Sequence, residues 1–296
     1  MEIDKKLFIN AGINYIYELD EFPRSSVFRQ VAKEFEEVLT LNNPDVLEKR
    51  RGYFGVGEAE AEDYLNRLIE TDEGPIVAGI RHLGNDRDKP FVLIWPSFKI
   101  SSLKSISECL KPHFEVFKPE SICYWLRPDC NDSNTKIIQQ RFIARIVDMP
   151  KHDLALLQHK QYYPWYQAEY ASFHQEHPKF VNRIQANSQE LMDASYEEGL
   201  LYTLTEGDNR IGLVAAERDT FLDRPTIYLN EILIAKNYRG KGYAARLLAG
   251  FVNRLNADYF VCEIDVDNVP STKTALRSGQ KVFSQENFFD IVDTNN

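Results

Sequence analysis

Cysteine is scarce in this sequence, and no long uninterrupted apolar run occurs in it. The 296 residues include four cysteines without a CxxC pair, so we expect reduced thiols in a cytoplasmic protein. No stretch approaches the ~18 apolar residues that a membrane-spanning helix needs. The N-terminal residues also lack the apolar core of a signal peptide, which agrees with a cytoplasmic location.

An excess of basic residues is missing as well. The 35 lysines and arginines are outnumbered by 45 aspartates and glutamates, which gives a net charge of −10. Duplex nucleic acids need a basic surface, so we expect no nucleic-acid partner, and we expect no membrane partner either. This acidity suits a cationic acceptor, although it also serves solubility.

The chain length suggests two domains, with a boundary near the sequence MPKHD at residues 149–153. We expect an N-terminal α/β domain over residues 1–148 and a second domain over residues 149–296. In the first domain, Val27, Val31 and Phe35 recur at helical spacing, and serine residues open a later helical pattern. The predicted helices of this half are 26–40, 58–70 and 101–114, and the predicted strands are 75–83, 90–98, 121–128 and 137–147.

The second half alternates strand and helix patterns. Two apolar runs joined by the turn EGDNR predict a hairpin, and a strand, helix, strand succession predicts a parallel crossover. We therefore expect a mixed α/β fold. Because the first half repeats only this order of elements, one interpretation is a degenerate second copy of the same fold. The predicted strands are 199–206, 210–219, 226–235, 258–266 and 287–293, and the predicted helices are 188–198, 240–256 and 270–279.

The loop Arg239-Gly-Lys-Gly242 lies between a predicted strand and a predicted helix. Glycines there are compatible with a simple turn, but the free N–H groups of a helix start, with two basic residues beside them, favour an anion. A Walker motif is excluded because no serine or threonine follows a GK pair. A dinucleotide motif matches in letters, yet four residues separate the strand from the first glycine, and too little chain follows for a doubly wound sheet.

The segment ILIAKNYRGKGYAARLL resembles the acetyl-CoA-binding segment of the GCN5-related N-acetyltransferase (GNAT) family, whose signature is R/Q-x-x-G-x-G/A. Arg239, Gly242 and Ala244 occupy the signature positions, and Asn268 to Ser271 resembles the family's next motif. The resemblance covers about residues 150–296. It implies a GNAT fold with a central mixed, splayed sheet, acetyl-CoA as co-substrate and no metal. The implied cofactor-binding residues are Ile232, Leu233, Ile234, Arg239, Gly240, Lys241, Gly242, Tyr243, Ala244, Asn268 and Ser271.

Acetyl transfer to an amine requires a base, a donor to the carbonyl oxygen and an acid for the thiolate. Glu231 is the predicted base, because a half-buried strand should raise its pKa; the alternatives are a structural ion pair and a side chain that faces solvent. The N–H of Leu233 or Ile234 is the candidate for the carbonyl. The family's usual tyrosine acid falls at Ala275, so we name Tyr228 as acid, with Tyr243, a tyrosine of the aromatic segment, or water as alternatives.

The aromatic segment 158–178 is where the family resemblance places the acceptor. Tyr162, Tyr163 and Trp165 flank a proline and are the predicted acceptor-binding residues, able to stack on a ring or hold a cation. Three further aromatic residues fit one helical face and are predicted to be core: Tyr166, Tyr170 and Phe173. His174 and His177 lie three residues apart, but they have no accompanying ligand pair, so we predict no metal site.

The resulting hypothesis is an N-acetyltransferase that acetylates a primary amine of a small molecule or peptide by direct attack in a ternary complex. One alternative is a non-catalytic CoA-binding regulatory or scaffold protein. The other is an acetyltransferase for protein N-termini or lysines. The first half is predicted to support the fold or shape the acceptor site, and no sequence pattern indicates the oligomeric state.

Overall fold

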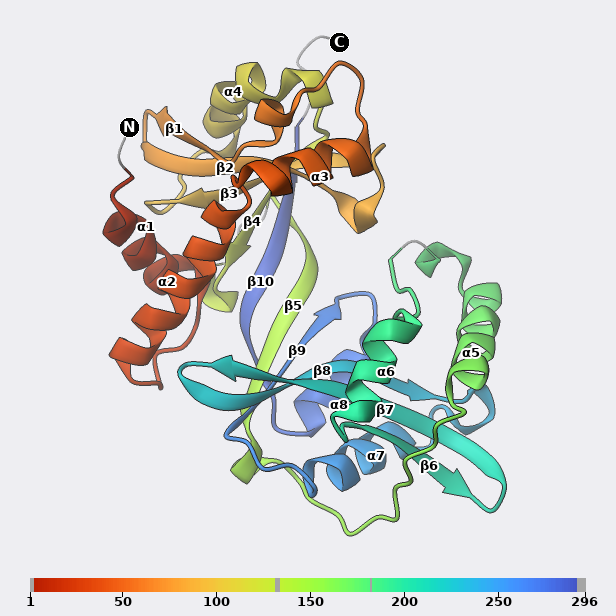
Figure 1. The fold of residues 1–296 in the computed structure, drawn as a ribbon. Coiled ribbons are helices and arrows are strands. Elements are labelled where there is room, and N and C mark those ends of the chain that lie inside the picture. The colour runs from red at the N-terminus through yellow and green to blue at the C-terminus, as the bar shows by residue number, and fades with distance from the viewer. Residues whose placement is uncertain (1–2, 131–133, 182, 292–296) are drawn as a thin grey trace. The chain divides into compact units, whose positions relative to one another are not determined.

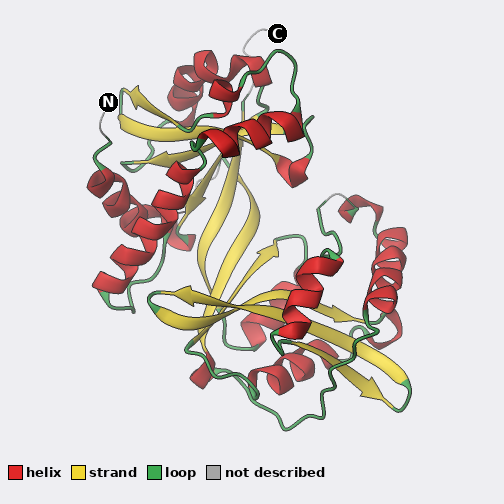
Figure 2. Cartoon of the chain, in the orientation of Figure 1, coloured by secondary structure: helices red, strands yellow, loops and turns green. Residues whose placement is uncertain are grey.

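The computed structural model describes residues 3–130, 134–181 and 183–291. The chain divides into two compact units, of which unit 1 comprises residues 1–139 and 283–296 and unit 2 comprises residues 140–282. In each unit, helices pack on a sheet (Figures 1 and 2). Within the described ranges, none of the helices combines the length and the apolar character of a transmembrane segment.

Unit 1 contains a mixed sheet in the order β1-β2-β3-β4-β10. Its neighbouring strands are antiparallel except for the parallel pair β3–β4. Alternate residues such as Ile80, Val92 and Ile122 are fully buried in one core, against which α4 packs Ile106. The strands are β1 Arg67–Thr71, β2 Gly74–His82, β3 Pro90–Pro96, β4 Ser121–Leu126 and β10 Lys281–Asp290; the helices are α1 Lys5–Ala11, α2 Arg24–Thr40, α3 Pro44–Phe54 and α4 Leu103–Phe114.

Unit 2 contains a mixed sheet in the order β5-β9-β8-β7-β6. Helices α5 and α6 pack on one face, and α7 packs on the other. The apolar side of α7 buries Leu247, Leu248 and Phe251, each worth about 1.5–3 kcal/mol of burial free energy. The strands are β5 Lys136–Arg145, β6 Leu201–Glu206, β7 Asn209–Phe221, β8 Arg224–Ile234 and β9 Tyr259–Asp265; the helices are α5 Tyr163–Glu176, α6 Gln189–Glu197, α7 Tyr243–Val252 and α8 Val269–Arg277.

The two units share a succession of elements. Strands β1, β2 and β3 pair antiparallel in turn, and α4 then leads to β4, which is parallel to β3. Strands β6, β7 and β8, helix α7 and strand β9 repeat this pattern. In both units, the parallel register consists of three residue pairs, Phe91–Leu93 with Ser121–Cys123 and Thr226–Tyr228 with Tyr259–Val261. The mixed α/β class is confirmed, while a duplication of one fold stays a prediction.

Two local predictions need correction. The helix predicted over residues 58–70 is absent: a single turn of 3-10 helix at Ala61–Tyr64 is followed by β1. Its acidic run ends in a reciprocal cap between Glu60 and Asp63, and pairing with β2 overrides the helical propensity beyond it.

The last strand is β10, which begins at Lys281, earlier than the predicted 287–293, whose residues 292 and 293 lie outside the described residues. It pairs antiparallel with β4, Asn287 opposite Tyr124, and this pairing assigns residues from Phe283 onward to unit 1. Local sequence patterns contain no information about such a distant partner. A division into domains at residues 148 and 149 therefore stays a prediction.

Candidate active site

The glycine loop connects β8 to α7 in unit 2. Gly240 and Gly242 have φ values of +75° and +79°, a conformation that favours glycine, and a side chain on either would meet open space. Gly242 caps the start of α7. Within the described residues, the N–H groups of residues 240–245 have no hydrogen-bond acceptor. These outward donors at a helix start form a cradle that fits a phosphate group of a cofactor.

The basic side chains of this loop are used for structure. Arg239 donates from Nε to the carbonyl oxygen of Ile234 at 2.9 Å and forms an ion pair with Glu176 at 3.3 Å. Glu169 lies 3.8 Å from the same guanidinium, and Lys241 donates to a carbonyl of its own loop. Arg239 therefore fixes the loop against β8 and α5, and the backbone N–H groups are left as the principal anion donors.

Strand β8 has an open edge directly before the loop. Its parallel register with β9 ends at Tyr228, whereas its antiparallel register with β7 continues to Ile234. Ala235 donates its N–H to Ile211, and because hydrogen-bonded pairs alternate, Leu233 faces β7 while Ile234 faces away. The N–H of Ile234 is therefore a better candidate than that of Leu233 for polarising a carbonyl oxygen. The carbonyl of Ile234 is already bound to Arg239.

Glu231 is buried on the same strand, with 8% of its surface exposed. The register between β7 and β8 shifts between Ala215 and Ala216, so that Asn230 is the extra residue of a bulge. The carboxylate oxygen Oε2 of Glu231 accepts hydrogen bonds from the hydroxyls of Tyr166 at 2.6 Å and Tyr170 at 2.8 Å. Burial raises the pKa of Glu231, and the two hydroxyls and the N–H of Ile232 oppose that rise.

The direction of one of these hydrogen bonds is fixed by Asn187. Its backbone N–H donates to the Tyr166 oxygen at 2.8 Å, so the Tyr166 proton is directed to Glu231. Its side-chain amide donates to the bulge carbonyl of Asn230 at 3.0 Å. Asn187 thus positions both Tyr166, which donates to Glu231, and the bulge residue that precedes Glu231.

The two tyrosines belong to α5 and are four residues apart, on one helical face. The prediction that Tyr166 and Tyr170 are buried is confirmed, but Phe173 is only partly buried. Sequence reasoning missed their contact with Glu231. Two hydroxyls at helical spacing were the only signal, and it did not reveal which strand they face.

The three predicted acceptor-binding residues differ in their surroundings. Only 1% of Tyr162 is exposed, and its hydroxyl donates to Asp193, so its role in acceptor binding stays a prediction. Tyr163 and Trp165 are partly buried. The hydroxyl of Tyr163 donates to the carbonyl of Asn187 at 3.0 Å, which connects it to the Glu231 environment.

The remaining predicted site residues lie in β8, β9 and α8. Burial raises the pKa of Tyr228, which Glu263 raises further, so its phenol keeps its proton at neutral pH. Ala275 is buried in an apolar cluster with Phe142 and Cys262, where a hydroxyl has no counterpart. Asn268 caps α8 by accepting the N–H of Ser271, so it has a local structural task.

The two histidines considered as metal ligands lie at the end of α5. The Nε2 atom of His174 lies 2.8 Å from the carbonyl oxygen of Ile184, and the ring of His177 packs on Phe173. In residues 3–130, 134–181 and 183–291, no three histidine, cysteine, aspartate or glutamate side chains gather closely enough to hold a metal ion.

Comparison with known proteins gives one family match. Residues 159–279 match the model of the acetyltransferase (GNAT) family. This segment contains the glycine loop, Glu231 and Asn268. No curated protein matches the chain.

Solved structures of similar fold include a GCN5-related N-acetyltransferase from Sphaerobacter thermophilus, with 11% identity, a TM-score of 0.48, and coverage of 87% of this chain and 94% of that chain. An acetyltransferase from the GNAT family from Colwellia psychrerythraea has 11% identity, a TM-score of 0.47, and coverage of 84% and 96%. A functionally unknown conserved protein from Staphylococcus epidermidis has 10% identity, a TM-score of 0.48, and coverage of 79% and 99%.

Proposed function

Because residues 159–279 match the model of the acetyltransferase (GNAT) family, we propose that the protein is an acetyl-CoA-dependent N-acetyltransferase for a primary amine of a small molecule or peptide. The observation that carries this proposal is the buried Glu231 carboxylate. It lies on the strand that precedes the glycine loop and is held by Tyr166 and Tyr170. A carboxylate with a raised pKa is suited to accept a proton near neutral pH.

Different groups would bind CoA and carry out the acetyl transfer. The N–H groups of residues 240–245 would hold the pyrophosphate of CoA, and the open edge of β8 would pair with its amide-rich arm. Bound acetyl-CoA supplies the activated acyl group. The N–H of Ile234 polarises the acyl carbonyl while the amine nitrogen attacks, and Glu231 takes the proton that the amine loses.

The C–S bond breaks as the C–N bond forms, and the departing thiolate gains a proton. The tyrosine that usually donates this proton in the family is absent, because position 275 is an alanine. We assign the proton to Tyr228, which keeps it at neutral pH; Tyr243, the first residue of α7, is the alternative. The acceptor amine is expected beside Tyr163 and Trp165.

The test is release of the CoA thiol from acetyl-CoA across a panel of primary amines, together with calorimetry of acetyl-CoA binding. We expect turnover with at least one amine, and binding that Gly242→Asp abolishes, because a carboxylate there repels the pyrophosphate. Absence of binding, or equal binding to Gly242→Asp, contradicts the proposal.

A second candidate function is a non-catalytic CoA-binding protein. It is favoured by the apolar surroundings of Ala275, which leave the thiolate without the usual donor. Tight CoA binding without turnover of any amine supports this function, and turnover with any amine excludes it.

A further inference from the structure

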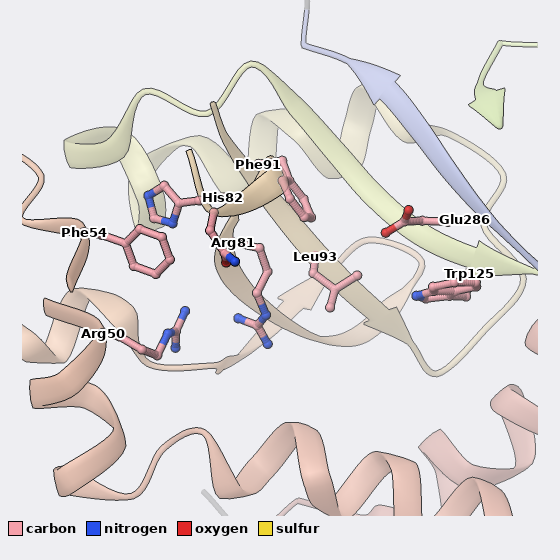
Figure 3. A pocket seen from close by; sticks show the side chains of 9 residues that line it. Arg50, Phe54, Arg81, His82, Phe91, Leu93, Trp125 and Glu286 are labelled. Carbon is pink, nitrogen blue, oxygen red and sulfur yellow. The ribbon is translucent and has the colours of Figure 1, made fainter. Parts of the chain in front are cut away.

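Unit 1 contains a cavity of about 290 Å³ that the proposed acetyl transfer does not use (Figure 3). It opens where β2 ends and β3 begins. On the sheet face opposite the main core, Arg81 of β2 stands opposite Phe91 of β3, and Leu93 stands opposite Cys123 of β4, whereas Phe54 and the His82 ring that it stacks on lie on the core side. Arg50 of α3 completes one end of the wall. All the lining residues belong to unit 1, whereas Glu231 and the glycine loop belong to unit 2.

Two guanidinium groups meet at one end of this cavity. Arg50 and Arg81 donate to the same carbonyl oxygen, that of Ile80, at 2.6 Å and 2.7 Å. Each also donates to a second neutral acceptor: Arg50 donates to the carbonyl of Tyr64, and Arg81 donates to the side chain of Asn66. In the described part of the chain, no carboxylate forms an ion pair with either arginine.

This pair of positive charges is costly without a counter-ion. Burial, and after it the charge of Arg50, lower the pKa of Arg81 to about 9. Partly buried like charges that share one neutral acceptor are stabilised when an anion binds between them. Guanidinium groups suit carboxylate and phosphate oxygens in particular, because their donors form a planar fork.

The walls beside the arginines are apolar and flat. Phe54 stacks on the His82 ring with the centroids 3.9 Å apart. His82 is 7% exposed, and neither ring nitrogen has a hydrogen-bond partner within the described residues. Burial and the two arginines lower the pKa of His82 to about 4, so the neutral ring offers one donor and one acceptor. Phe91 and Leu93 face the same space (Figure 3).

We propose that this cavity binds a small organic anion whose carboxylate or phosphate group lies at Arg50 and Arg81 and whose planar apolar body lies along Phe54, Phe91 and Leu93. Glu286 lines the end away from the arginines, so a second anionic group there would be repelled (Figure 3).

The test is calorimetry on the full chain with three probes that share a phenyl ring: benzoate, phenyl phosphate, and benzamide as the neutral isostere of benzoate. We expect at least one anion to bind about tenfold or more tightly than benzamide. The tighter of the two anions identifies the head group as carboxylate or phosphate. Equal binding of the anions and benzamide, or no binding of either anion, overturns the proposal.

Variants locate the binding. Arg81→Gln is expected to weaken anion binding about tenfold or more, whereas Arg87→Gln, which removes a highly exposed arginine of the β2–β3 turn, leaves it unchanged. Leu93→Trp places a bulky ring in the cavity, where it obstructs the ligand body, and keeps both arginines, so it gives the same answer if Arg81→Gln does not fold. Unchanged anion affinity in folded Arg81→Gln or Leu93→Trp overturns the proposal. Gly242→Asp should bind the anion normally, which keeps this test independent of the acetyltransferase proposal.

Discussion

Removing the Tyr170 hydroxyl tests the environment of Glu231 more directly than removing the carboxylate. In Tyr170→Phe, Glu231 loses a 2.8 Å hydrogen bond in a buried setting. A hydrogen bond to a charged group contributes roughly 1.5–3 kcal/mol. Since about 1.36 kcal/mol corresponds to one pH unit, the ionisation that controls the base should move up by about one to two pH units.

The assay is the pH dependence of kcat/KM for acetyl transfer. Activity rises with pH as the base ionises, so the rising limb of Tyr170→Phe should lie at higher pH than that of the wild type. On that limb, the variant should be about 10- to 100-fold slower at a given pH. At pH values above both limbs, the two rates should converge, because the carboxylate itself is intact.

The matched control is Tyr162→Phe. Tyr162 is a buried tyrosine of the same cluster, but its hydroxyl donates to Asp193. This variant loses a comparable hydrogen bond and should keep the wild-type rising limb. A limb that stays in place in Tyr170→Phe, or moves equally in Tyr162→Phe, refutes the assignment of Glu231 as the base.

Two further predictions concern Glu231 and the glycine loop. Glu231→Gln should reduce kcat about 10²- to 10⁴-fold, the range for loss of a general base. Because folding raises the pKa of Glu231, its contribution to stability is present at acidic pH and lost as pH rises. In melting experiments, the stability of Glu231→Gln relative to the wild type should therefore increase as pH rises. A relative stability that increases as pH falls would contradict this. Gly242→Ala should lower the free energy of unfolding in urea by about 1–2 kcal/mol, since its φ is +79° and its side chain meets open space. The control is Gly207→Ala in the β6–β7 turn, where φ is +58° and the surroundings are equally open, so it should lower the free energy of unfolding by a similar amount. Only the Gly242 variant should weaken acetyl-CoA binding. Equal affinities of the two variants would contradict the placement of the phosphate.

Local chemistry made much of unit 2 predictable. Glycines are typical of positions with positive φ, so the pair indicated the turn. The strand before it and the apolar face of α7 after it show their hydrophobic periodicity in the sequence itself. The same reasoning failed at residues 58–70, where an acidic, helix-like run gives way to β1 because a partner strand is available. The burial of Glu231 was open from the sequence, because one extra residue in β8 reverses which face a side chain occupies.

By itself, the sequence determined most of the strands and helices of unit 2, the glycine loop and the candidate base, since each depends on residues close together in the chain. The tertiary structure decided which groups meet. It brought Tyr166 and Tyr170 of α5 to Glu231, assigned Arg239 to the loop backbone, and joined β10 to β4. It also placed Arg50 and Arg81 on one carbonyl oxygen. These contacts join residues far apart in sequence, and their geometry depends on sheet register and helix packing, which no local pattern specifies.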